Sequence, residues 1–370
     1  MSEGTLIIGG GIVGLGIGWR LAQRGEPVTV LERGEAGREA SSASAGLLAP
    51  ATEVHYQEDL NLALGLESIG MYGEFVAELE SVTGEPVDYR REGAIAIALT
   101  ADDAADLKDL YEYQRARKLP VRWLSGDGVR ELEPGISSFA TAGIQCDMDH
   151  QVDPRRLVHA MRTAFVKAGG TLLEHTEVTG MRINGGPPAV RAGEREYTAR
   201  RLVIAAGAWS GLLPGLPEAV RPPVRPVKGQ ALSLRSHQPE FLRHLVRTPR
   251  CYMGPKSDGR IVVGATVEEM GFNRDLTAGG MYELLRAAWE ALPGVYELPI
   301  QEMWCGFRPG SRDNGPILGE SRIPGVFVAT GHFRNGILFA PVTAHYMSRL
   351  ILEGDLPEAL KPFSPLRFSA

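Results

Sequence analysis

Three glycines near the start of the chain have the spacing of a turn that binds a dinucleotide. Gly9, Gly11 and Gly14 form the pattern G-x-G-x-x-G between an apolar run, TLII, and a stretch with helical periodicity. The first glycine permits a tight turn, the second lets the backbone approach a pyrophosphate, and the third lets the helix pack closely on the strand. Glu32 ends the next β-like run, where a carboxylate can accept hydrogen bonds from a ribose. An ordinary strand-to-helix turn could carry the same glycines, but these flanking features favour a bound adenine dinucleotide.

A second turn bounded by glycines, near the end of the chain, indicates which dinucleotide is bound. A strand is expected over Val326 to Ala329, followed by the turn GHFRNG at 331–336 and an apolar helix from Gly336 to Leu352. The N-terminus of that helix would face the cleft, and its dipole would stabilise the negative charge of a reduced flavin. A nicotinamide would gain nothing comparable, so this arrangement favours FAD over NAD.

The stretch from Ala40 to Leu48, ASSASAGLL, consists largely of small residues. It has too few large apolar side chains to build a core, whereas its hydroxyls and small side chains suit close contact with a large, flat ligand. A flexible serine-rich loop would have the same composition, and composition alone does not decide between the two.

Length and composition describe an ordinary globular protein. The chain has 370 residues, 44% hydrophobic and 23% charged, which allows two domains of ~150 residues each. A net charge of −6 without a basic stripe argues against a nucleic-acid partner. The apolar runs are shorter than the roughly 18 residues that a membrane span requires, so we expect no membrane segment.

Cys146, Cys251 and Cys305 are widely spaced and odd in number, so the sequence suggests neither a disulfide framework nor a C-x-x-C metal site. We therefore expect no bound metal. The N-terminal apolar run has no basic segment before it and no small-residue cleavage site after it, which argues against a signal peptide. These features favour a cytoplasmic protein.

Periodicity along the chain predicts strands and helices that alternate at both ends and an antiparallel sheet between them. Capping residues and apolar stripes predict helices over 58–83, 101–119, 125–132, 153–169 and 277–292. Apolar runs predict strands over 93–99, 171–174, 178–183 and 202–206. The antiparallel sheet is expected from period-2 segments without intervening helices, namely GQALSLR, the strands around the turn KSDGR, and IQEMWCGFR.

The nucleotide-binding domain is expected to be discontinuous, because the series of elements after residue 153 returns the chain to the first sheet. Proline-rich residues 222–226 mark a crossing between the two domains. We expect an FAD-binding domain of residues 1–85, 147–220 and 310–370, and a substrate-binding domain of residues 86–146 and 221–309.

Motifs along nearly the whole chain add a family likeness: GGGIVGLGIGWRLAQRG, EASSASAGLLAP, VDP, LVIAAGAWS, VRPVKGQ, RIVVGAT, GFRPGSRDNGPILG and ATGHFRNGILFAP. In this order and spacing they resemble the glycine oxidase branch of the FAD-dependent D-amino-acid oxidase family. The resemblance implies an α/β FAD-binding domain, Rossmann-like and of the glutathione-reductase type, and an α+β substrate domain with a largely antiparallel sheet. It also implies noncovalent FAD, oxidation of glycine or small D-amino acids by O2 to an imine and hydrogen peroxide, and a homo-oligomer, either a tetramer or a dimer.

The same resemblance implies roles for residues at matching positions. Arg308 in GFRPG would bind the substrate carboxylate, because a planar guanidinium can do so bidentately. Arg334 in GHFRNG and Tyr252 would assist. An ion pair is the ordinary role of an arginine, but two arginines in glycine-bounded turns at one expected cleft favour a substrate role. The implied cofactor contacts are Gly9, Gly11, Ile12, Val13, Gly14, Glu32, Arg33, Ala40, Ser41, Ala45, Gly46, Leu47 and Val178, with His332, Phe333, Arg334, Asn335, Gly336, Ile337 and Leu338 around the flavin ring.

The implied chemistry needs no dedicated base. An amine with a neutral nitrogen can pass its α-hydrogen as hydride to flavin N5, so the protein supplies orientation and electrostatics, and His332 is expected to act through its main chain. Cys305 could suggest covalent flavin attachment, as in sarcosine oxidases, but WCGFR does not clearly match their motif, and a packed thiol is expected. Arg250 and Val267 differ from the pocket residues expected in glycine oxidases and leave the preferred side chain open.

Other functions share this fold. A sarcosine-type or other secondary-amine oxidase, or a D-amino-acid dehydrogenase, would differ in its substrate or would pass electrons to a quinone. A flavin-binding protein that oxidises no amine, such as a tRNA-modifying protein, would be expected to have a basic surface. The leading hypothesis is an oxidase of glycine and small D-amino acids that gives a 2-oxo acid and ammonia from the imine, or supplies the imine for the thiazole of thiamine.

Overall fold

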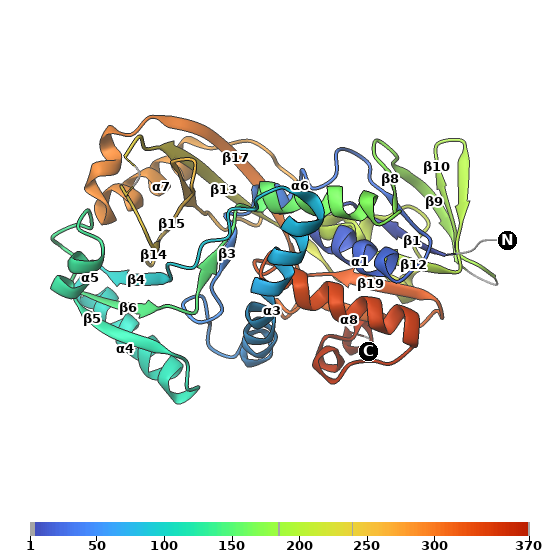
Figure 1. Ribbon diagram of the computed structural model, residues 1–370, viewed down its shortest axis with the longest axis horizontal. Helices are drawn as coiled ribbons and strands as arrows, with labels where there is room; N and C mark the ends of the chain where they lie inside the picture. Colours follow the sequence, from blue (N-terminus) through green and yellow to red (C-terminus); the bar gives the residue numbers. More distant parts are fainter. Residues whose placement is uncertain (1–3, 184–185, 239, 369–370) are drawn as a thin grey trace.

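The computed structural model describes residues 4–183, 186–238 and 240–368. Two large sheets lie side by side along the long axis of the molecule, and helices pack against each of them (Figure 1). The expected fold class is confirmed: a mainly parallel sheet with helices stands beside a largely antiparallel one.

The N-terminal motif folds as the expected strand, turn, helix and strand. β1 (Thr5–Ile8) leads through the glycine turn into α1 (Ile12–Gln23), and β2 (Val28–Leu31) pairs parallel with β1. The sheet has the strand order β18-β19-β12-β1-β2-β8, and only β18 and β19 are antiparallel neighbours. The other four strands are β8 (Thr171–Leu173), β12 (Arg201–Ile204), β18 (Ile317–Glu320) and β19 (Val326–Thr330). Parallel strands place their carboxyl ends at one edge of the sheet, so the turns after β1 and β19 meet there.

Helix α1 is buried along most of its surface, as its sequence requires. It is apolar around most of its circumference, and such a helix is stable only when it is covered. Trp19 at its centre is fully buried and packs edge-on against Phe75. The covering helices are α3 (Asp59–Thr83), α6 (Pro154–Lys167) and α8 (Ala340–Glu353).

Helix α6 begins as its sequence predicts. The Asp153 carboxylate accepts hydrogen bonds from the N–H groups of Arg155 and Arg156 at 2.9 and 3.1 Å, and Pro154 occupies the first turn. The chain then passes through β8 and a small antiparallel sheet before it reaches β12. That small sheet consists of β9 (Val178–Arg182), β10 (Ala189–Ala192) and β11 (Arg195–Thr198).

The second large sheet has eight strands in the order β17-β13-β16-β15-β14-β4-β6-β5, antiparallel except between β14 and β4. Its longest pair, β13 (Arg225–Arg235) and β17 (Ile300–Gly310), extends toward the first sheet. β15 (Tyr252–Pro255) and β16 (Arg260–Gly264) form the hairpin predicted around KSDGR. The remaining elements of this part are β4 (Ala94–Ala98), α4 (Ala101–Ala116), β5 (Val121–Ser125), α5 (Gly126–Leu132), β6 (Ala142–Cys146), β14 (Leu245–Arg247) and α7 (Ala278–Ala291).

Two local expectations need adjustment. Helix α8 begins at Ala340 and not at Gly336, and residues 333–339 form consecutive turns. Pro341 has no N–H to donate to the carbonyl of Ile337, so the regular hydrogen-bond ladder cannot extend upstream through it. The serine-rich stretch is ordered as α2 (Ala40–Ala43) and β3 (Leu47–Leu48), and β3 pairs with β7 (His150–Gln151).

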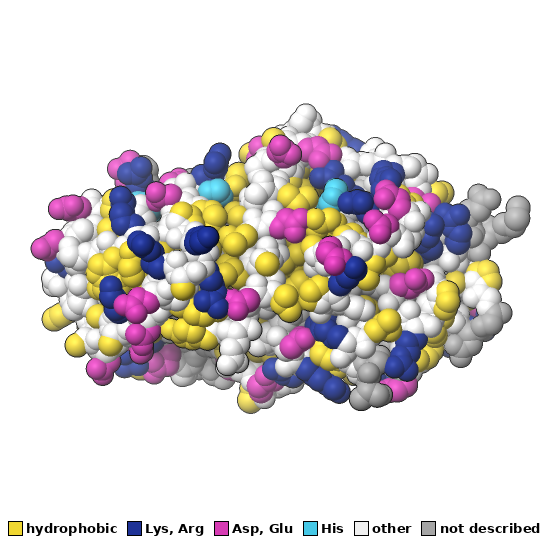
Figure 2. Space-filling model, turned by 90° about the horizontal axis from the view of Figure 1, so that it is seen from below, with side chains coloured by type: hydrophobic (Ala, Val, Ile, Leu, Met, Phe, Trp, Pro, Cys, Tyr) yellow, Lys and Arg dark blue, Asp and Glu magenta, His cyan; other side chains and the backbone are white. Residues whose placement is uncertain are grey.

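None of the helices in the described ranges is both long and apolar enough to cross a bilayer. On the face shown in Figure 2, basic and acidic side chains are interspersed, with apolar groups between them.

Two helical glycines offer a matched test of the close packing at the N-terminal turn. A Cβ at Gly14 would overlap the carbonyl oxygen of Gly9, whereas a Cβ at Gly70, on the exposed face of α3, would meet nothing within 4 Å. We expect Gly14→Ala to lower the free energy of unfolding by about 1–3 kcal/mol through overpacking. Gly70→Ala should raise it by roughly 0.5–1 kcal/mol through helix propensity. Urea unfolding of both variants measures this, and equal effects would contradict the packing role of Gly14.

Candidate active site

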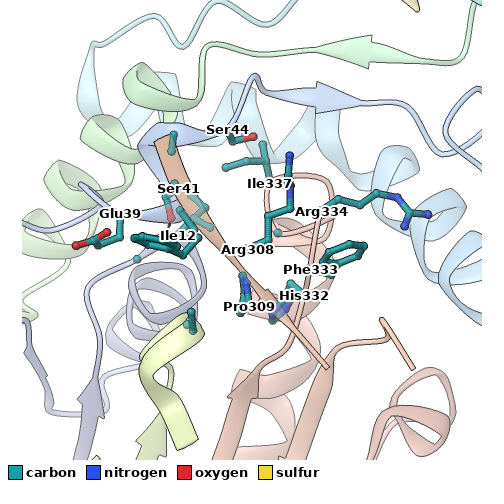
Figure 3. Close-up of a pocket in the computed structure, with 18 of the residues that line it drawn as sticks. Ile12, Glu39, Ser41, Ser44, Arg308, Pro309, His332, Phe333, Arg334 and Ile337 are labelled. Atoms are coloured by element: carbon teal, nitrogen blue, oxygen red, sulfur yellow. Dashed lines mark hydrogen bonds between the residues drawn. The ribbon is translucent and has the colours of Figure 1, made fainter. Parts of the chain in front are cut away.

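A cavity of about 730 Å³ lies between the carboxyl edge of the first sheet and strands β13, β15, β16 and β17 of the second (Figure 3). Its volume is in the range of about 300–1,000 Å³ that cofactor and ligand sites occupy. The lining comes from both glycine turns, the serine-rich stretch and the strand pair β13–β17. Segments far apart in the sequence therefore meet at one site.

At one end of the cavity, the first glycine turn exposes the backbone. Gly9 has a φ of 110°, and a Cβ there would overlap the carbonyl of Ala205. The first turn of α1 carries no acidic side chain that would neutralise its dipole. The Ser41 hydroxyl accepts a hydrogen bond from the N–H of Ile12 at 3.0 Å, which fixes the serine-rich stretch against this turn. The arrangement leaves N–H groups and a positive dipole end available to an anion.

The Glu32 carboxylate stands beside this turn and is held by the main chain. It accepts hydrogen bonds from the N–H groups of Gly10 at 2.8 Å and Gly34 at 2.9 Å. These bonds orient a carboxylate that also borders the cavity, as ribose recognition requires.

Most of the site residues predicted from the sequence border this cavity. They are Gly9, Gly11, Ile12, Val13, Glu32, Arg33, Ala40, Ser41, Ala45, Leu47, Val178, Tyr252, Arg308, His332, Phe333, Arg334, Gly336 and Ile337. Gly14, Gly46, Asn335 and Leu338 do not border it. Gly46 is required by the backbone, since it has a φ of 78° and its Cβ would overlap the carbonyl of Val152.

Arg308 brings a guanidinium to the other end of the cavity. Its Nη1 donates hydrogen bonds to the carbonyl oxygens of Thr266 at 3.1 Å and Lys228 at 3.4 Å. In the described part of the chain, no carboxylate lies within ion-pair distance of this group. Burial lowers its pKa from the usual value, while Tyr252 and Glu53 favour the charged form. An arginine stays protonated in proteins, so the site holds a partly buried cation without an anionic partner among the described residues.

Tyr252 stands beside this cation. It pairs across the β15–β16 hairpin with Gly264, and a Cβ at Gly264 would overlap its hydroxyl. Burial raises the pKa of the phenol to about 12, so the hydroxyl keeps its proton and can donate a hydrogen bond. That hydroxyl has no hydrogen-bond partner among the described residues. Gly229 on β13 makes equivalent room for Arg308, because a Cβ there would lie 2.6 Å from both terminal nitrogens.

Arg334 differs from Arg308 in its surroundings. Its guanidinium forms an ion pair with Glu58 and donates to the carbonyl oxygen of Glu53 at 3.4 Å. Figure 3 shows its side chain reaching away from Arg308. Its charge is thus already matched by a protein carboxylate, and its predicted role as a second carboxylate ligand stays a prediction.

His332 is buried and borders the cavity. Its Nε2 lies 3.1 Å from the Thr343 hydroxyl, and burial lowers its pKa to about 4. The imidazole is therefore neutral at pH 7 and already has a partner. Its lowered pKa makes it a weak base, and the expectation that His332 is not a general base stays a prediction.

Several charged residues near Arg308 carry no recognisable signal in the sequence. Arg247 donates to the carbonyl oxygen of Thr52 at 2.7 Å and lies 3.6 Å from the Glu53 carboxylate. Asp149, fully buried, holds the same loop by accepting from the N–H groups of Ala51 and Thr52 at 3.0 and 2.7 Å. Arg247 is thus matched by the Glu53 carboxylate, whereas Arg308 has no carboxylate within ion-pair distance among the described residues.

A comparison with known families identifies the class of protein. The family model described as FAD dependent oxidoreductase (DAO) matches residues 5–350. The chain belongs to the DAO family of FAD-dependent oxidoreductases, and FAD is its cofactor. The residues fit that cofactor, because the glycine turn exposes N–H groups, Glu32 is oriented beside it, and one cavity joins this turn to the Arg308 end.

Relatives narrow the class further. The chain is 34% identical over 363 residues to the glycine oxidase of Geobacillus kaustophilus, covering 98% of this chain and 96% of that protein. A crystal structure of glycine oxidase from the same organism has a TM-score of 0.93 at 33% identity, covering 100% of this chain and 99% of that one. The bifunctional protein ThiO/ThiG of Synechocystis sp. is 36% identical over 371 residues, or 98% of this chain and 54% of that protein. The protein is thus a flavoenzyme similar to glycine oxidases.

The neutral state of buried His332 predicts an acid-dependent loss of stability. A histidine in the unfolded chain gains a proton near pH 6.5, but folded His332 resists it until about pH 4, so stability is complete above pH 6.5 and declines as the pH falls toward 4. We expect protonation at this group to lower the free energy of unfolding by roughly 2 kcal/mol between pH 7.5 and 5. His332→Gln, which cannot titrate, should lose correspondingly less stability over that interval.

Unfolding at both pH values, with the same excess of FAD, measures this difference. His150 contributes equally to both proteins, because burial lowers its pKa to about 4 as well. If His332→Gln loses as much unfolding free energy between pH 7.5 and 5 as the wild type does, the prediction is contradicted.

Proposed function

We propose that this flavoenzyme oxidises the α-amine of glycine and small D-amino acids with O2 as electron acceptor. The observation that carries the proposal is the Arg308 guanidinium, which borders the cavity without a carboxylate partner beside the free hydroxyl of Tyr252. A substrate carboxylate would complete that charge pair and accept a further hydrogen bond from the tyrosine.

The charges at this end support a substrate with one carboxylate. Arg334 and Arg247 already lie against Glu58 and Glu53, so one cation remains for the ligand. Fixing the carboxylate at Arg308 also fixes the adjacent α-carbon, and orientation of this kind supplies much of the rate of a bound reaction.

Proton handling in this proposal needs no protein base. The amine reacts as its neutral form after it has lost its proton to solvent, and His332, which is hydrogen-bonded to Thr343 and has a pKa lowered by burial, takes no proton from it. When bound, FAD supplies the acceptor for the α-hydrogen and its two electrons, which O2 then takes to become hydrogen peroxide. The product imine is hydrolysed to a 2-oxo acid and ammonia.

The relatives support the same activity and suggest the biosynthesis in which its product is used. One relative is a glycine oxidase, and another is a bifunctional protein that joins ThiO to ThiG. We propose that the imine can serve thiamine thiazole synthesis.

We also propose that FAD is bound noncovalently. The Cys305 thiol does not border the cavity and donates a hydrogen bond to the carbonyl oxygen of Arg274 at 3.3 Å.

Three further expectations stay proposals. They are a homo-oligomeric assembly, a cytoplasmic location, and domain limits of 1–85, 147–220 and 310–370 for FAD binding and 86–146 and 221–309 for substrate binding. The strands of the two large sheets are distributed along the chain in a way that supports these limits.

Peroxide formation tests the activity. The purified holoenzyme is assayed with glycine, D-alanine, sarcosine and D-proline under air, and flavin bleaching is followed without oxygen. Bleaching together with peroxide from glycine is expected. Bleaching with electron transfer only to a quinone would identify a dehydrogenase, and no bleaching by any of the four amines would refute amine oxidation.

Substitution of Arg308 tests the carboxylate site. Removing one partner of a buried charge pair costs about 2–5 kcal/mol, so Arg308→Ala should lower kcat/KM for glycine roughly 30- to 5,000-fold while FAD absorbance is retained. Tyr252→Phe should cost less, about 1 kcal/mol, because one neutral donor is lost. Arg312→Ala, exposed four residues further along, is the matched control and should keep wild-type kinetics. Wild-type kcat/KM in Arg308→Ala would overturn the assignment.

A further inference from the structure

The segment between β16 and α7, residues 265–277, starts in the antiparallel sheet but makes contacts on the cofactor side. The Phe272 ring stacks on the Trp209 indole, with ring centroids 4.7 Å apart and an interplanar angle of 24°. The Arg33 guanidinium also lies on this indole, 3.8 Å from its centroid. Trp209 is thus flanked by a residue next to Glu32 and by a residue of the 265–277 segment.

The ionic contacts of the same segment close a ring. Arg274 forms an ion pair with Glu39 at 2.7 Å, and Glu39 pairs with Arg33 at 3.1 Å. Because Phe272 and Arg274 are two residues apart, the contacts run in a circle. We call these five residues the clasp: Arg33, Glu39, Trp209, Phe272 and Arg274.

The clasp lies in the wall of the cofactor cavity. Arg33, Glu39 and Trp209 border the cavity, whereas Phe272 and Arg274 do not. The Arg274 side chain is 56% exposed, so it faces solvent on one side and the lining residues on the other. Phe272 and Arg274 therefore support the wall from outside without bordering the cavity themselves.

The ends of the segment are anchored, which makes this support rigid. Buried Lys228 on β13 donates to the carbonyl oxygen of Asp275 at 2.6 Å. Buried Gln230, on the same strand, donates its N–H to the Thr266 hydroxyl at 2.8 Å and accepts from the N–H of Thr277 at 2.8 Å. Both ends of the segment are therefore tied to β13, the strand whose carbonyl at Lys228 accepts a hydrogen bond from Arg308.

We propose that Phe272 and Arg274 are positioning residues of the FAD-binding site, contributed by the antiparallel sheet. They hold the Trp209 indole, the Arg33 guanidinium and the Glu39 carboxylate in place along the cofactor. Loss of either support frees these three side chains to move, and the cofactor then dissociates faster. The proposal concerns retention of FAD and is independent of which amine is oxidised.

The test measures release of FAD from the holoenzyme. Each protein is diluted into an excess of an FAD-trapping apoprotein, and the dissociation rate constant is followed by flavin fluorescence. Phe272→Leu removes the aromatic stack but keeps an apolar side chain, and Arg274→Ala removes the ion pair. We expect each to release FAD about 3- to 10-fold faster than the wild type, since one exposed ion pair or one aromatic contact is lost.

Conservative and control variants separate positioning from general effects. Phe272→Tyr keeps the ring and should release FAD at the wild-type rate. Arg286→Ala on α7 removes a comparable surface ion pair, with Glu283, and a contact to the Tyr282 ring, far from the clasp, and should also behave as the wild type. Wild-type release rates in both Phe272→Leu and Arg274→Ala would overturn the proposal.

A folding defect would also loosen FAD, so the FAD-free proteins are melted in parallel. The proposal requires that FAD-free Phe272→Leu and Arg274→Ala melt within about 2 °C of the FAD-free wild type, as expected for changes that cost well below 1 kcal/mol. A lower melting temperature that fully accounts for faster release would assign these residues to general stability and would also refute the proposal.

Discussion

The site depends on a guanidinium that the protein partly buries without giving it a counter-ion. Taking a charge out of water is costly unless it is paired, and two backbone carbonyls satisfy Arg308 only in part. The β13–β17 pair tolerates this desolvation free energy because its residues are paired almost throughout and its strands are anchored in the second sheet. A ligand carboxylate offsets the same cost, which couples the stability of this strand pair to the recognition of an acid.

The two C-terminal arginines show which features of the site can be predicted from local sequence and which cannot. Arg308 lies in strand β17 and Arg334 in the turn after β19, and both border the cavity, yet of the two only Arg308 lacks an acidic partner. Glu58, which pairs with Arg334, lies 276 residues earlier in the chain, and no local pattern links the two. Charge balance is a property of the folded arrangement, so residue types and spacing could locate the site but not decide which cation is free.

Other features could be predicted because their causes are local. The glycines of the first turn, the Asp153 cap of α6 and the hairpin around KSDGR follow from backbone conformation and hydrogen bonding within a few residues. The start of α8 was harder to predict, because two local features conflict there. The apolar pattern continues upstream of the helix, whereas Pro341 lacks the N–H that a longer helix would need. The loop that carries Glu53 is held by Asp149, about 100 residues away in sequence, and this support became visible only in the fold.

The glycines opposite the polar side chains also limit how the substrate range of this enzyme can change. Gly229 and Gly264 are already the smallest residues, so the inner wall cannot be widened there, and any larger residue would displace Arg308 or Tyr252. The rim is different: Val267 borders the cavity but is 68% exposed, and Arg250 also lies at this border. Larger amine substrates can therefore be accommodated by substitutions at the rim, whereas the wall around Arg308 and Tyr252 has to stay as it is.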